Sequence, residues 1–176
     1  MPDDIFCPMH APSERNRRSI RVPGYDYRWA GGYFVTICTH LKRCILGEIV
    51  DGQMDLSKAG RLAEQSLLDL PKRIPGLRID SHVTMPNHAH ALIEIGTAPS
   101  PGGKIPTLGL IVRQWKAASC HLIRSAVDSS FGWQRNYYER IVRDHEDMEN
   151  IRTYIANNPA NWNQDVENSE NGTQQS

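Results

Sequence analysis

Residues 84–95 (TMPNHAHALIEI) constrain the fold of this 176-residue chain more than any other stretch. Pro86 and Asn87 are typical of a turn, and the apolar residues after His90 favour a β-strand. Side chains alternate between the two faces of a strand, so His88 and His90 lie on one face while the alanines and isoleucines lie on the other. Two imidazoles held on one rigid face make half of a site for a divalent cation. The rest of the chain must supply the other half.

The remaining elements follow from local signals. β-Branched, aromatic or alternating residues predict strands at 33–39 and 77–84, and residues 133–143 end in a short strand. Asp51-Gly52 predicts a hairpin because it joins two strand-like segments, 45–50 and 53–56. Three helices are expected after the N-cap residues Ser57, Thr107 and Asp144, ending near Pro71, Ala126 and Pro159.

This order predicts an α+β fold. Without the hairpin and the last helix it is β-α-β-β-α-β, the ferredoxin-like or RRM-like pattern of an antiparallel sheet with helices on one face. The other face is open, and His88 and His90 can point toward it. We expect a basic flexible arm at 1–20, one folded domain at 21–162 and a polar disordered tail at 163–176.

Composition narrows the classes of protein. The longest apolar runs fall short of the ~20 residues that span a bilayer, and residues 1–6 lack the features of a secretory signal, so a cytoplasmic protein without a membrane partner is expected. The four cysteines lack C-x-x-C spacing and are expected to be free thiols; a zinc site at Cys38 and Cys44 is a weaker alternative. Residues 1–143 carry 19 basic and 13 acidic side chains, whereas 144–176 carry one and seven. A basic body of this kind is compatible with a polyanionic partner.

The last helix offers the missing half of the site. Tyr154 and Asn158 are four residues apart and therefore share one helical face. A tyrosine oxygen beside a cation held by two histidines and an amide oxygen is a plausible nucleophile, and its natural target is a phosphodiester. Because Asn158 precedes Pro159, a frayed helix end is an alternative explanation for it.

Several blocks of the chain, taken in order, resemble one family. The segment 85–90 (MPNHAH) resembles the HUH motif of single-tyrosine transposases. Residues 133–143 (WQRNYYERIVR) and 154–159 (YIANNP) are similar to the two later signatures of the REP-associated tyrosine transposase branch, and residues 17–27 and 31–39 are similar to its N-terminal block. The resemblance spans about Arg17 to Trp162.

The resemblance implies an enzyme that cuts and rejoins single-stranded DNA beside short hairpins. By analogy, His88, His90 and Asn158 hold Mg²⁺ or Mn²⁺, and Tyr154 attacks the phosphate to give a 5′-phosphotyrosine and a free 3′-hydroxyl. It also implies a monomer or a homodimer, since the REP-associated branch is thought to act as monomers and transposon-borne relatives as dimers.

Two other functions remain open. One is a catalytically idle DNA-binding protein, and the other is a histidine-triad nucleotide hydrolase, although Leu92 stands where that motif has a third histidine. Whether the protein is a DNA-cutting enzyme or an idle DNA-binding protein, basic side chains are expected to contact phosphates and aromatic side chains to stack on bases. These predicted DNA-binding residues are Arg17, Arg18, Arg21, Arg113, Lys116, Trp133, Arg135, Tyr137, Tyr138, Arg140 and Arg143.

Overall fold

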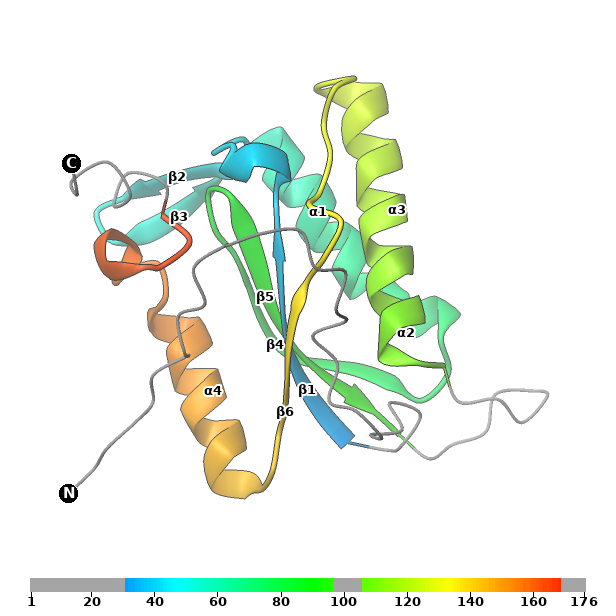
Figure 1. Cartoon of the computed structure of the whole chain (residues 1–176). Helices are drawn as coiled ribbons and strands as arrows, with labels where there is room; N and C mark the ends of the chain where they lie inside the picture. The colour runs from blue at the N-terminus through cyan, green and yellow to red at the C-terminus, as the bar shows by residue number, and fades with distance from the viewer. Residues whose placement is uncertain (1–30, 97–105, 169–176) are drawn as a thin grey trace, which may run out of the picture.

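A four-stranded antiparallel sheet with the order β4-β5-β1-β6 forms the centre of the computed structural model, which describes residues 31–96 and 106–168 (Figure 1). This is the strand order of a ferredoxin-like fold, so the predicted fold class is confirmed. Its strands are β1 (Gly31–Cys38), β4 (Leu77–Thr84), β5 (His88–Ile95) and β6 (Tyr138–Ile141).

The register between β1 and β5 places the histidines. Cys38 lies opposite His88 and Thr36 lies opposite His90. Facing residues of two paired strands project to the same side of the sheet. Thr36 and Cys38 are therefore the β1 neighbours of the two imidazoles.

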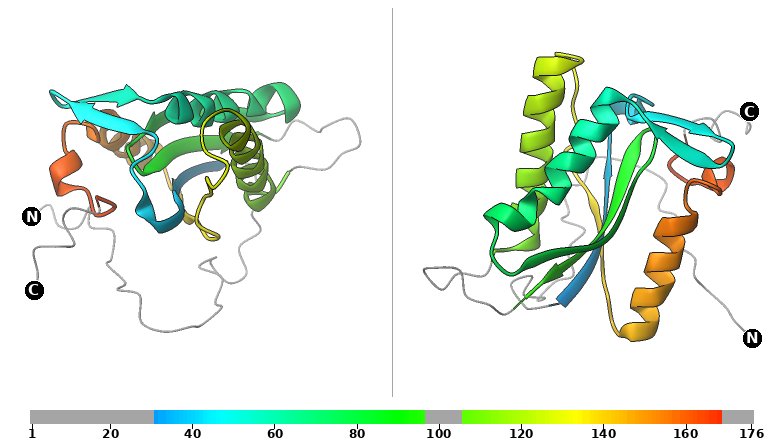
Figure 2. Two further views of the ribbon diagram at one scale, coloured as in Figure 1. Left: turned by 90° about the horizontal axis from the view of Figure 1, so that it is seen from above. Right: turned by 180° about the vertical axis from the view of Figure 1, so that it is seen from behind.

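The two faces of the sheet carry different helices. α1 (Lys58–Leu68) and α3 (Leu108–Ala126) lie side by side on one face, next to the short α2 (Leu70–Arg73) (Figure 2). α4 (His145–Asn157) lies on the other side of the sheet in Figure 1, where Ile151 and Ile155 pack on Leu92. The histidine face is thus only partly open, because α4 covers one portion of it.

Side chains form the predicted N-caps of all three long helices. The side chain of Ser57 accepts a hydrogen bond from the Gly60 amide. In the same way, Thr107 accepts from the Leu110 amide and Asp144 from the Asp147 amide. Each cap satisfies an amide that has no partner inside the helix. Pro71 differs from the prediction: α1 ends at Leu68, and Pro71 lies in the first turn of α2, where a missing N–H costs nothing.

The hairpin forms as the Asp-Gly pair predicts. It consists of β2 (Gly47–Val50) and β3 (Gln53–Leu56), and its two turn residues have positive φ angles, 50° at Asp51 and 74° at Gly52. Positive φ at both central residues is the signature of a type I′ turn.

The larger core lies between the sheet and the helices α1 and α3. Trp115 is fully buried there, and its Nε1 donates to the Ala63 carbonyl at 3.0 Å. Trp133 belongs to the same core, where it packs edge-on against Phe131 and donates to Ser119 Oγ at 2.9 Å. Trp133 is therefore not available to stack on DNA, and that prediction is wrong.

Residues 162–168, which we call the C-terminal strap, fold back beside the hairpin (Figure 1). The sequence predicts disorder from residue 163, which is wrong for residues 163–168: η2 (Trp162–Gln164) opens the strap, and Asp165 and Asn168 are buried. No helix within the described ranges combines the length and the apolar character needed to cross a membrane.

Candidate active site

The two predicted imidazoles meet on the α4 face of the sheet. His88 Nε2 and His90 Nε2 are 3.0 Å apart, and the residues are 0% and 3% exposed. Burial lowers the pKa of both side chains; for His88 the carboxylates of Asp165 and Glu167 oppose that effect. Both imidazoles are thus held neutral, which is the form that binds a metal ion.

Asn87 fixes the tautomer of His88. Its Nδ2 donates to the carbonyls of Glu167 at 2.7 Å and of Lys42 at 3.4 Å. Its Oδ1 therefore faces His88 Nδ1 at 2.9 Å and must accept that hydrogen. The lone pair of His88 is left on Nε2, which points at His90.

Thr36 holds His90 in a different way. Its hydroxyl lies 2.8 Å from His90 Nδ1 and can either donate or accept. When His90 Nε2 carries the proton, it donates to His88, and Thr36 donates to Nδ1. When a cation takes both Nε2 atoms, the proton belongs on Nδ1 and Thr36 accepts it. The hydroxyl thus supports both states.

Replacing Thr36 by Val tests this role. Valine has nearly the same shape but cannot hydrogen-bond to His90 Nδ1, so we expect Mn²⁺ affinity to fall about 10- to 100-fold. Titration followed by the electron paramagnetic resonance signal of free Mn²⁺ measures this. Thr36→Ser keeps the hydroxyl and should restore most of the affinity; equal affinities in all three proteins would contradict the assignment.

Two oxygen donors from the end of the chain complete the cluster. Asn158 donates through Nδ2 to Asp165 Oδ2 at 3.0 Å, and its own Oδ1 is buried without a hydrogen-bond partner among the described residues. Asp165 Oδ2 is 3.8 Å from His88 Nε2, and ligand atoms of His88, His90 and Asp165 all lie within 4.8 Å of one another. The helix does not fray before Pro159, since Asn158 has φ −58° and ψ −43°.

These donors fit a hard divalent cation. Two bonds of about 2.1 Å at a right angle end about 3.0 Å apart, which is the separation expected of adjacent ligands on an octahedral ion. The two Nε2 atoms have this separation. An orphaned amide oxygen and a carboxylate are suitable additional ligands for Mg²⁺ or Mn²⁺. Sequence reasoning missed Asp165 because nothing near it in the chain indicates a site.

Tyr154 lies at the edge of this cluster. Its hydroxyl is 3.5 Å from His90 Nε2, and its ring meets His90 and Phe34 edge-on. The residue is 43% exposed, so it is accessible to solvent as well as to the histidines. This is the arrangement expected of a nucleophile beside a cation site.

An ion pair fixes α4 relative to the sheet. Arg152 donates from Nε and from a terminal nitrogen to the two oxygens of Asp80, at 2.7 and 2.8 Å. Asp80 lies where the β4–β5 register shifts between Ile79 and Ser81. Its carboxylate faces the helix that carries Tyr154, as the two hydrogen bonds from Arg152 show.

This pair should make stability depend on pH. The hydrogen bonds from Arg152 lower the pKa of Asp80, so its folded pKa lies below the value of about 3.9 for an unfolded aspartate. A depressed carboxyl pKa stabilises the fold above about pH 4, and the contribution disappears as the pH falls further. Denaturant unfolding should show a smaller stability loss below pH 4 in Asp80→Asn than in the wild type. Parallel pH curves would contradict this.

Other predicted DNA-binding residues lie around a second region of the surface. Arg113, Lys116, Arg135 and Tyr137 line a hollow of about 480 Å³ between α3 and residues 132–137. Lys116 Nζ donates to the carbonyls of Gln134 and Asn136 at 2.9 and 2.7 Å, and burial lowers its pKa to about 8. Lys116 therefore shapes this hollow more than it offers a free charge.

The remaining residues of that prediction are scattered. Tyr138 is 52% exposed on β6, Arg140 pairs with Asp147, and Arg143 is exposed before α4. Arg17, Arg18 and Arg21 lie outside the described residues.

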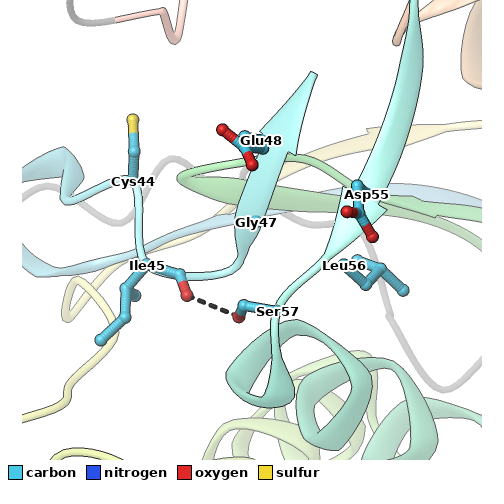
Figure 3. A pocket seen from close by; sticks show the side chains of 7 residues that line it. All are labelled: Cys44, Ile45, Gly47, Glu48, Asp55, Leu56 and Ser57. Carbon is cyan, nitrogen blue, oxygen red and sulfur yellow. Dashed lines mark hydrogen bonds between the residues drawn. The ribbon is translucent and has the colours of Figure 1, made fainter. Parts of the chain in front are cut away.

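A further hollow of about 330 Å³ lies at the base of the hairpin (Figure 3). It is lined by Cys44, by the carboxylates of Glu48 and Asp55, and by Ser57, whose hydroxyl donates to the Ile45 carbonyl at 2.7 Å. It includes neither histidine, so it is separate from the cluster around Tyr154.

Comparison with known proteins agrees with the predicted resemblance. No family model matches the chain. A protein of Haemophilus influenzae, described as an uncharacterized protein, is 40% identical to this chain over 165 residues. The match covers 85% of this chain and 92% of the Haemophilus protein. The structure of the REP-associated tyrosine transposase bound to a REP hairpin overlays with a TM-score of 0.55 at 18% identity, covering 85% of this chain and 74% of that one. The chain belongs to one family with the Haemophilus protein, and its resemblance to the REP-associated tyrosine transposases is confirmed at the level of the fold.

Proposed function

We propose that the protein is a metal-dependent nuclease and strand transferase for single-stranded DNA next to a hairpin. The observation that carries this proposal is the position of the Tyr154 hydroxyl, 3.5 Å from His90 Nε2 at the edge of two buried, neutral imidazoles. A hydrolase that used water would not need a half-exposed tyrosine at this point. The fold is shared with a REP-associated tyrosine transposase that was solved with a REP hairpin, and this supports DNA as the substrate.

The residues present could hold Mg²⁺ or Mn²⁺ through His88, His90 and Asn158. When bound, such an ion would supply Lewis acidity for the polarisation of a phosphodiester and for the charge that develops on its oxygens. Asn87 and Thr36 orient the imidazoles for this task through their Nδ1 atoms. In the DNA-free protein, the amide of Asn158 is oriented by its hydrogen bond to Asp165.

Tyr154 then performs a phosphoryl transfer. Its oxygen forms a bond to phosphorus as the bond from phosphorus to the 3′ oxygen breaks, so a 5′-phosphotyrosine and a 3′-hydroxyl result. The tyrosine loses its proton to solvent, and the leaving oxygen gains one. The number of phosphate ester bonds is unchanged, and a 3′-hydroxyl can therefore reverse the step without ATP.

We propose that DNA also contacts the basic surface on α3, β6 and the loop before α4. Arg113 and Arg135 lie beside the larger hollow, and Arg140 and Arg143 lie near the start of α4. Residues 132–134 are hydrogen-bonded to the end of β1, directly beside His88. A single DNA strand that contacts these side chains would therefore pass one end of the β-sheet and reach Tyr154.

One chain contains both Tyr154 and the histidines that it approaches. We therefore propose that Tyr154 acts on the cation site of its own chain, which requires only a monomer. The expected cytoplasmic location stays a prediction.

The test is a covalent adduct assay. The protein is incubated with 5′- and 3′-labelled DNA strands, each a hairpin with a single-stranded tail, in the presence of Mn²⁺ and then denatured. We expect a labelled protein–DNA band that is lost when EDTA replaces Mn²⁺. Tight DNA binding without an adduct across a panel of hairpins would favour an idle DNA-binding protein, and hydrolysis of a mononucleotide alone would favour the hydrolase.

A further inference from the structure

The C-terminal strap closes over the histidines. Glu167 accepts a hydrogen bond at its carbonyl from Asn87 Nδ2 at 2.7 Å, and its carboxylate pairs with Lys42 at 3.1 Å. The Trp162 ring lies 6.0 Å from the His88 ring. The strap is thus attached beside His88 through Trp162 and Glu167.

Asp165 is the strap residue that points into the cluster. Its side chain is 2% exposed, and its Oδ2 lies 3.8 Å from His88 Nε2 and 3.0 Å from Asn158 Nδ2. Its Oδ1 accepts the Glu167 amide hydrogen at 2.7 Å, which fixes the plane of the carboxylate. Asp165 Oδ1 therefore stabilises the strap, and Oδ2 faces His88 and Asn158 at the proposed cation site.

A second observation points to a ligand in the same place. Asn158 Oδ1 is buried and has no hydrogen-bond partner among the described residues, although its Nδ2 is satisfied by Asp165. An unsatisfied buried acceptor is costly, and an ion can relieve that cost. The cluster around His88 thus combines two imidazole lone pairs, an orphaned amide oxygen and a carboxylate oxygen.

We propose that Asp165 is a protein ligand of the cation in the DNA-free protein and that a DNA phosphate oxygen takes its place when substrate binds. This rests on the proposed function, because it concerns the same cation site. A carboxylate and a phosphodiester both offer hard, anionic oxygens, so one can replace the other at Mg²⁺ or Mn²⁺. His88 is 0% exposed beneath the strap, so a phosphate can approach it only after Asp165 has moved away.

The first measurement is Mn²⁺ affinity without DNA. Asp165→Asn keeps the shape of the side chain but removes its charge, and we expect the affinity for Mn²⁺ to fall about tenfold or more. Glu94→Gln is the matched control, because this carboxylate lies on β5 with the histidines but pairs with Arg78 instead of facing the cluster. Its Mn²⁺ affinity should stay near that of the wild type. Melting temperatures show whether both variants are folded.

The second measurement is the affinity for hairpin DNA in saturating Mn²⁺. Asp165→Asn should bind the DNA several-fold more tightly, because no carboxylate competes with the phosphate. Unchanged Mn²⁺ affinity in a folded Asp165→Asn protein would overturn the ligand assignment, and weaker DNA binding would overturn the replacement. If the wild type itself binds no Mn²⁺, the proposed function fails at its cation site, and this inference fails with it.

Discussion

A Tyr154→Phe protein should form no covalent adduct with hairpin DNA in Mn²⁺. The substitution removes one oxygen atom, which is the proposed nucleophile 3.5 Å from His90 Nε2. Loss of a nucleophile leaves only positioning and electrostatic effects, so we expect cleavage to fall by about 10³-fold or more. A denaturing gel of labelled DNA measures adduct and free product together.

Tyr138→Phe is the matched control for that experiment. Tyr138 lies on β6, is 52% exposed and belongs to the same predicted DNA-contacting surface. We expect this variant to keep the adduct, and we expect the Tyr154→Phe protein to keep its affinity for both DNA and Mn²⁺. An adduct that persists in Tyr154→Phe and disappears in Tyr138→Phe would move the nucleophile to β6.

Replacing Trp115 by Ala should destabilise the fold by about 3–5 kcal/mol. The side chain extends from α3, is fully buried against α1 and Trp133, and its Nε1 donates to the Ala63 carbonyl of α1. The substitution therefore opens a cavity and leaves a buried carbonyl without its donor. Urea unfolding followed by far-UV circular dichroism measures the change.

A second substitution on the same helix separates packing from helix propensity. Leu122 lies on α3 but is 40% exposed, so Leu122→Ala should change the free energy of unfolding by about 0.5 kcal/mol or less. Similar losses at both positions would show that the core is not organised around Trp115.

The parts of the fold that the sequence predicted well depend on neighbours in the chain. Ser57, Thr107 and Asp144 cap helices because each side chain reaches an amide three residues on. Asp51-Gly52 makes a tight turn because both residues tolerate positive φ. The shared face of His88 and His90 follows from strand alternation alone, and the 3.0 Å between their Nε2 atoms is consistent with it.

The parts that sequence reasoning missed depend on contacts between distant residues. Trp133 stands among polar and basic residues, but Ser119 on α3 accepts its N–H and makes it part of the core. Asp165 stands in a polar segment of the kind that is usually disordered, yet Asn87 and Asn158 hold the strap beside His88. Lys116 looks like a phosphate contact and instead supports two backbone carbonyls. No local pattern encodes such partners.

The anchoring of α4 makes the site depend on helical phase. Arg152 and Tyr154 lie on the last two turns of α4 and Asn158 is its C-cap, so the anchor to Asp80 precedes the proposed nucleophile and ligand. Each residue adds about 100° of rotation and 1.5 Å of length to an α-helix. An added residue between Arg152 and Tyr154 would hardly lengthen the helix, yet it would turn the phenol away from the histidines. The spacing between anchor and nucleophile is therefore as much a part of the site as the side chains themselves.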